Sequence, residues 1–286
     1  MKTKTINQYV TAYDYAQDCD RLRLQADNLL DLDLRVFSKT LHAMPRRNDY
    51  RVLDVGCAHG YAARTRLPRL GVPFQCLGVD ICAEAITQAT SEQEDERFQY
   101  ECISLEALSP ETHGLFDIVF AAYVLHHLPD PATTLQRLWD LLHPGGALIV
   151  RGIDDDMRSL DPPNPDLELL LDSTRSLARG TDRHFGRRMH GMLLNLCPLP
   201  DLTFMDYKVD STGGLDEKGR HEYYENALSF RAEYARRMLD RSDASDAERT
   251  LAVEVLQAAA RLQALFAHDK KQYVALVHSV AVALKQ

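Results

Sequence analysis

The chain has 286 residues, of which 45% are hydrophobic and 26% are charged, as is ordinary for a globular protein. This length suffices for one large domain, or for one domain with a cap. The formal net charge of −9 excludes a general electrostatic attraction to nucleic acid or to an anionic membrane surface. We therefore expect neither nucleic acid nor a membrane among the partners.

The six cysteines have no Cys-x-x-Cys spacing, and several lie in apolar runs, which is typical of reduced core thiols in a cytosolic protein. Residues 1–5 precede no apolar signal core. The longest apolar run, 118–125, is too short to span a bilayer. These features predict a cytoplasmic protein.

Residues 1–48 are predicted to form a helical cap, because leucines are mixed with charges at roughly helical spacing before residues 45–49 interrupt the pattern. Strands and helices then alternate, which indicates an α/β fold whose open, mostly parallel sheet is covered on both faces. The expected elements are strand 51–55, helix 61–70, strand 74–80, helix 83–90, strand 98–103 and strand 117–122.

The second half departs from simple alternation. A helix over 131–142 is expected to end at Gly145 and Gly146, and the Asp- and Pro-rich residues 152–165 are expected to form a loop. The further expected elements are strand 147–151, helical residues 166–195 with a break at Gly180, strand 202–211, two amphipathic helices in 220–268 and strand 273–284.

The sheet domain would therefore comprise residues 49–216 and 270–286 and contain seven strands. Residues 217–269 would be a helical insertion before the last strand. The insertion either caps a substrate or makes the contact of a homodimer, and the sequence leaves both alternatives open.

The segment 52–60 is an apolar strand that leads into a glycine turn, and Asp80 ends a second apolar run about 20 residues later. Glycines allow the backbone to approach a ligand closely, and an acid at this distance can accept both hydroxyls of a ribose. Gly56 and Gly60 have the spacing Gly-x-x-x-Gly, which differs from the Gly-x-Gly-x-x-Gly of pyrophosphate sites. A nucleoside without phosphates fits better, which favours S-adenosylmethionine over a nicotinamide dinucleotide.

Several segments together resemble class I S-adenosylmethionine-dependent methyltransferases, particularly the small-molecule branch of ubiquinone/menaquinone-biosynthesis and natural-product enzymes. The resemblance implies a Rossmann-like sheet with an N-terminal helical cap, and S-adenosyl-L-methionine as the cofactor. The segments are 52–60, Asp80, 116–123, 124–131 and 142–146, with weaker matches at 21–25 and 186–188.

The resemblance also implies cofactor-binding positions. Asp54 would orient the loop, Ile81 would pack on the adenine, and the small residues Ala121 and Ala122 would lie beside the methionine part. Ser104 and Leu105 replace an acid that the family usually has near the adenine. The full expected set is Arg21, Gln25, Asp54, Gly56, Cys57, Gly60, Asp80, Ile81, Ser104, Leu105, Ala121 and Ala122.

Two histidines, His126 and His127, are the candidate catalytic residues, because a neutral imidazole can act as a general base near neutral pH. The alternative is that they pack at the start of a helix or are solvated there. Residues Asp154 to Asp156 could hold a cationic amine or a divalent metal, but a solvated acidic loop is the favoured interpretation and we expect no metal site.

The sequence thus predicts methyl transfer to an oxygen, nitrogen or carbon of a small metabolite, by in-line displacement. One alternative is a methyltransferase of the same fold that acts on protein or RNA. Another is a protein that binds S-adenosylmethionine without catalysis. The acceptor, the methylated atom and the oligomeric state are left open.

Overall fold

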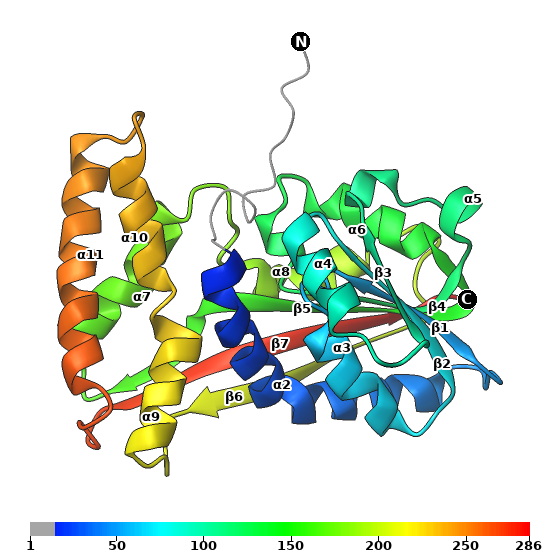
Figure 1. Cartoon of the computed structure of the whole chain (residues 1–286), viewed down its shortest axis with the longest axis horizontal. Helices are drawn as coiled ribbons and strands as arrows, with labels where there is room; N and C mark the ends of the chain where they lie inside the picture. Colours follow the sequence, from blue (N-terminus) through cyan, green and yellow to red (C-terminus); the bar gives the residue numbers. More distant parts are fainter. Residues whose placement is uncertain (1–14) are drawn as a thin grey trace. The chain divides into compact units, whose positions relative to one another are not determined.

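The computed structural model describes residues 15–286, with side chains from Asp18 onward. Seven strands form one sheet in the order β3-β2-β1-β4-β5-β7-β6 (Figure 1). The predicted seven-stranded α/β fold is therefore confirmed. The strands are β1 (Tyr50–Val55), β2 (Phe74–Asp80), β3 (Phe98–Cys102), β4 (Phe116–Ala122), β5 (Leu142–Asp161), β6 (Leu202–Ser211) and β7 (Tyr273–Leu284).

The sheet is parallel over its first five strands and antiparallel at β7. Strand β1 pairs in parallel with β2 and β4. Strand β3 pairs in parallel with β2, and β5 pairs in parallel with β4. At β6 and β7, Asp201 N–H donates to the carbonyl of Leu284, whereas Thr212 N–H donates to that of Val274. Opposite ends of the two strands therefore meet, as in an antiparallel pair. All five parallel strands consequently have their carboxyl ends at one edge of the sheet.

Local signals in the sequence account for several helix boundaries. Asp130 accepts a hydrogen bond from the Thr133 N–H at the start of α6, and Ser245 with Glu248 forms a capping box at the start of α11. The helices include α2 (Tyr15–Ala43), α3 (Tyr61–Arg66), α4 (Ala83–Ser91), α5 (Pro110–His113), α6 (Pro131–Asp140), α7 (Pro165–Leu177), α8 (Phe185–Leu193), α9 (Glu217–Tyr223), α10 (Arg231–Asp240) and α11 (Asp246–Leu265), with 3₁₀ turns η1 (Leu67–Leu70), η2 (Leu105–Ala107) and η3 (Leu125–His127) and a π turn, η4 (Tyr224–Leu228).

The chain divides into two compact units. Unit 2 comprises residues 26–153, 185–208 and 278–286 and holds a core on each face of its strands. Successive strand residues alternate between these cores, so that Val52 packs with α2 and α3 whereas Leu53 packs with α6 and α8. Figure 1 shows α2 and α6 on the two faces.

Unit 1 comprises residues 1–25, 154–184 and 209–277, and the structure describes it from Tyr15. Its separate apolar core lies among α7, α10 and α11, with the aromatic rings of Tyr223, Tyr224 and Phe266. The helices expected over 220–268 are present, and they pack with α7.

The prediction of a loop over residues 152–165 is wrong for most of this segment, because β5 continues to Asp161. The acidic residues of this segment are compatible with a buried strand because arginines neutralise them: the carboxylate of Asp155 contacts both Arg183 and Arg231. The glycines expected to end the preceding helix lie instead within β5. There the pairing with β4 shifts between Phe116 and Ile118, and Gly145 has a φ of 78°.

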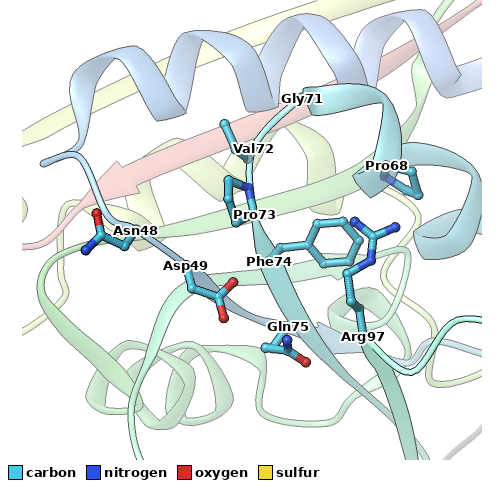
Figure 2. A pocket seen from close by; sticks show the side chains of 9 residues that line it. All are labelled: Asn48, Asp49, Pro68, Gly71, Val72, Pro73, Phe74, Gln75 and Arg97. Atoms are coloured by element: carbon cyan, nitrogen blue, oxygen red, sulfur yellow. The ribbon is translucent and has the colours of Figure 1, made fainter.

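A hollow of about 620 Å³ lies at the amino ends of β1 and β2. Figure 2 shows Phe74 and Arg97 on its wall, where the guanidinium lies 4.3 Å from the centre of the phenyl ring. This hollow is at the edge of the sheet opposite to the carboxyl ends of the parallel strands. Within residues 15–286, no helix is long and apolar enough to cross a membrane.

Candidate functional site

The glycine turn between β1 and α3 is a tight loop with three left-handed residues. Gly56, Ala58 and Gly60 have φ values of 67°, 48° and 71°. The N–H groups of Gly56 and Cys57 both donate to the carbonyl of Val79 in β2, at 2.8 and 3.1 Å. The loop therefore begins directly at the carboxyl end of the central strand, where open α/β sheets bind ligands.

Asp80 is the last residue of β2, and its carboxylate stabilises this loop by hydrogen bonds. One carboxylate oxygen accepts the Ala58 N–H at 3.0 Å, and the other accepts the Cys82 N–H at 2.9 Å. Burial raises the pKa of the Asp80 carboxyl, while these backbone hydrogen bonds act in the opposite direction. The structure thus brings Asp80 and the glycine loop together, as the spacing in the sequence predicted.

Both loop glycines are required by close neighbours as well as by their φ angles. A Cβ atom at Gly56 would lie 2.3 Å from Cγ2 of Val124, and one at Gly60 would lie 2.3 Å from the hydroxyl of Tyr100. Val124 follows β4, and Tyr100 lies on β3. The glycine spacing therefore serves packing within the protein and leaves the loop backbone close to the ends of the neighbouring strands.

Asp54 lies in the strand just before the loop and is buried in a polar network. Its carboxylate is 3.8 Å from a guanidinium nitrogen of the fully buried Arg66, whose other nitrogen contacts Asp33 at 3.1 Å. Arg151 of β5 also contacts Asp33, at 2.6 Å. Burial raises the pKa of Asp54 to about 6, although Arg66 opposes the rise. Asp54 therefore belongs to a network of buried charged side chains at the strand end from which the loop begins.

The other expected cofactor residues of unit 2 surround the same strand ends. The Cys57 thiol is buried, and burial raises its pKa well above the usual range. Ile81 is 43% exposed directly after Asp80, so it presents an apolar surface next to the loop. Ala121 and Ala122 end β4, whereas Ser104 and Leu105 lie at the start of η2, after β3.

His126 and His127 lie in the 3₁₀ turn η3 after β4, where both residues are buried and their ring centroids are 4.0 Å apart. The ring of His126 also makes an edge contact with Tyr123, at 6.2 Å. The structure places these candidates at the carboxyl edge of the sheet, as expected from their position after β4.

Two residues at this edge were missed as functional candidates. The Tyr123 hydroxyl forms a hydrogen bond with Nδ1 of His278, at 2.5 Å. These residues are 155 positions apart, and a single histidine in an apolar strand gives no sequence signal of this contact. The positive φ of Tyr123, 57°, is likewise invisible in the sequence.

Arg21 and Gln25 belong to unit 1. Arg21 forms an ion pair with Asp18, with one contact at 2.7 Å, and its guanidinium lies 5.2 Å from the ring centre of Phe230. Gln25 is half-buried one helical turn further along α2.

The acidic segment after Ile153 differs from the predicted solvated loop, since Asp154 and Asp155 are buried. Burial would raise the pKa of Asp155, but the guanidiniums of Arg231 and Arg183 hold it well below its usual range. Asp154, Asp156 and His184 have ligand atoms that all lie within 4.8 Å of one another. Asp156 also forms an ion pair with Arg175, at 2.9 Å.

Comparison with known proteins agrees with this geometry. Residues 53–150, from β1 through the start of β5, match the family described as methyltransferase domain. The matched segment contains the glycine loop, Asp80, both alanines of β4 and the two histidines of η3.

Curated proteins that are similar to part of this chain are named ubiquinone biosynthesis O-methyltransferase. The protein from Albidiferax ferrireducens is 38% identical over 99 residues, which is 34% of this chain and 38% of that protein. The protein from Xanthomonas campestris pv. campestris is 35% identical over 125 residues, covering 39% of this chain and 51% of the relative. The chain thus spans about two fifths to one half of the length of these relatives.

Two solved structures have a similar fold. The YcgJ protein from Bacillus subtilis has a TM-score of 0.53 and 17% identity, covering 90% of this chain and 99% of its own. The plantazolicin methyltransferase BamL, solved with a triazolic desmethylPZN analog and SAH, has a TM-score of 0.51 and 14% identity, covering 95% and 90% of the two chains. With the family match, these comparisons confirm the resemblance to class I methyltransferases.

Proposed function

We propose that the chain binds S-adenosylmethionine at the Gly56–Gly60 loop and transfers its methyl group in line to an oxygen, nitrogen or carbon of a small metabolite. The observation that carries this proposal is the carboxylate of Asp80. It lies at the end of β2 and is hydrogen-bonded to the loop at Ala58. A nucleoside bound at the carboxyl edge of such a sheet would place its ribose hydroxyls next to this acid.

The residues present fit an adenosyl group. The two oxygens of the Asp80 carboxylate accept backbone N–H groups, those of Ala58 and Cys82 among them, and have further lone pairs that can accept a ribose hydroxyl. The exposed side chain of Ile81 offers an apolar surface to an adenine ring. No glycine pattern for a pyrophosphate is present in the sequence, which supports a nucleoside without phosphates.

When bound, S-adenosylmethionine would supply an activated methyl group on a sulfonium. The chain then has to hold the acceptor in line with that methyl and to exclude water, and such alignment can contribute about 7–11 kcal/mol in favourable cases. Ala121 and Ala122 leave room at the end of β4 for this approach. The names of the curated relatives favour an oxygen acceptor among the three atoms.

Calorimetric titration with S-adenosylmethionine, S-adenosylhomocysteine and NAD tests the cofactor assignment. We expect both adenosyl ligands to bind and NAD not to bind. Asp80→Ala should weaken adenosyl binding about 10- to 100-fold, because a charged acceptor of hydrogen bonds is lost. Asp49→Ala is the matched control, since Asp49 is exposed at the amino end of β1.

Thermal melting of each variant shows whether Asp80→Ala still folds. Binding of NAD alone, or adenosyl binding that is indifferent to Asp80 in a folded variant, would overturn the proposed site. Adenosyl binding without turnover of any small acceptor would favour the non-catalytic alternative.

A further inference from the structure

Tyr123 has a backbone conformation that its residue type disfavours. It follows β4 directly and has a φ of 57°, in the left-handed region where a bulky side chain costs about 1–3 kcal/mol. Its N–H donates to the carbonyl of Arg151 at 2.9 Å, which continues the pairing of β4 with β5 for one more residue. The surrounding sheet therefore maintains a strained tyrosine at the edge where ligands bind.

The strained conformation accompanies a specific side-chain contact. The Tyr123 hydroxyl and Nδ1 of His278 are 2.5 Å apart, and both residues are only partly buried. The guanidinium of Arg151 lies 4.9 Å from the centre of the phenol ring. An imidazole from β7 and a guanidinium from β5 thus fix the position of a phenol that belongs to β4.

Tyr123 precedes a residue that packs against the glycine loop. The next residue, Val124, is the side chain that a Cβ atom at Gly56 would meet. Tyr123 is therefore one residue from the contact that joins the end of β4 to the loop. His126 and His127 are more deeply buried than Tyr123, so Tyr123 is the most accessible of these three residues.

We infer that the Tyr123 hydroxyl contacts the methyl acceptor and takes its proton, and that His278 positions Tyr123 and receives the phenol proton in turn. This inference rests on the proposed function and specifies its acceptor as a hydroxyl compound. The acceptor oxygen forms its bond to the methyl carbon as the sulfur–carbon bond breaks. The acceptor proton passes to the Tyr123 oxygen, and the Tyr123 proton passes to Nδ1 of a neutral His278. Once the methylated product has left, the imidazolium returns the proton to solvent by way of the Tyr123 hydroxyl.

The test uses the full chain with S-adenosylmethionine and with catechol and 3,4-dihydroxybenzoate as probe acceptors. We compare Tyr123→Phe, His278→Asn and His278→Ala with the wild type. Tyr207→Phe and His190→Asn are the controls, since Tyr207 is exposed on β6 and His190 lies on α8. Calorimetry with S-adenosylhomocysteine shows in each variant whether the cofactor site is intact.

We expect Tyr123→Phe to lower kcat about 100-fold with little change in KM or in S-adenosylhomocysteine affinity, because only a proton transfer is lost. His278→Asn can still accept a hydrogen bond and should keep more activity than His278→Ala. Both His278 variants should lose the acid limb of the pH–kcat profile, because neither side chain can bind the proton.

Ionisable side chains in ring contact with Tyr123 include Arg151 from β5 and His126 from η3, whose ring lies against His127. His126→Gln therefore identifies the origin of the acid limb. Loss of the limb in His126→Gln but not in the His278 variants would overturn the inference. So would unchanged kcat in a folded Tyr123→Phe that still binds S-adenosylhomocysteine. Absence of turnover by the wild type would instead count against the proposed function, and the inference would fall with it.

Discussion

The carboxylate of Asp80 and the backbone N–H of Ala58 are joined by a hydrogen bond of 3.0 Å, which ties the end of β2 to the glycine loop. Asp80 therefore has two tasks in the proposed site, to shape the loop and to accept ribose hydroxyls. An amide in its place keeps the size of the side chain, but it loses the charge and keeps only one oxygen for the two backbone N–H groups.

We predict that Asp80→Asn weakens S-adenosylhomocysteine binding about 10-fold, which is less than Asp80→Ala, because the neutral amide still offers one accepting oxygen. Titration calorimetry measures the affinity, and urea unfolding reports whether the loop has become unstable. Equal affinities in Asp80→Asn and the wild type would show that the charge plays no part in binding.

Gly60→Ala should destabilise the fold more than Gly71→Ala. The two glycines have nearly equal φ angles, 71° and 67°, so the backbone strain of an added side chain is similar, about 1 kcal/mol. A Cβ atom at Gly60 would lie 2.3 Å from the Tyr100 hydroxyl, whereas nothing lies within 4 Å of one at Gly71. Urea unfolding of both variants isolates the clash, and equal losses of stability would contradict it.

Asp54 should give the protein a stability that falls as the pH rises. Its folded pKa of about 6 exceeds the ordinary 3.8, so the folded state binds the proton more tightly and is favoured at low pH. At about 1.4 kcal/mol per pKa unit, this is about 3 kcal/mol that is lost as the pH rises from about 4 to above 6. Asp54→Asn should remove this dependence.

The check is the difference in unfolding free energy between Asp54→Asn and the wild type at pH 4 and at pH 7. We expect the variant to gain relative to the wild type at the higher pH. Asp201→Asn, an exposed residue, is the control and should show a constant difference. A constant difference for Asp54→Asn would mean that Arg66 compensates for burial completely.

Asp155→Asn should cost about 3–5 kcal/mol of stability, because it leaves the buried guanidiniums of Arg183 and Arg231 without their carboxylate. The adjacent Asp156→Asn should cost less than about 1 kcal/mol, since its ion pair with Arg175 is exposed. Chemical unfolding compares the two. The pKa of Asp155 is lowered in the folded state, so its contribution is present above the unfolded pKa and is lost as the pH falls.

The sequence predicted those parts of the fold in which local pattern and tertiary environment agree. Strands such as β2 and β7 have the bounds that their apolar runs indicated, and Asp80 lies beside the glycine loop as its spacing required. The end of β5 was missed because its aspartates are neutralised by Arg183 and Arg231, which lie 28 and 76 residues away from Asp155. His278 was missed for the same reason, since its partner Tyr123 is 155 residues distant.

The buried carboxylate of Asp33 has a consequence for the order of assembly during translation. Its two guanidinium partners are Arg66 and Arg151, and the latter is made 118 residues after it. At a synthesis rate of about 5–20 residues per second, Arg151 is added to the chain roughly 6–24 seconds after Asp33. Until then, docking of Leu29, Leu32, Val36 and Phe37 on their face of the sheet would bury an incompletely neutralised acid. We therefore expect α2 to pack on the sheet only after Arg151 has been made, and its apolar residues to remain exposed until then.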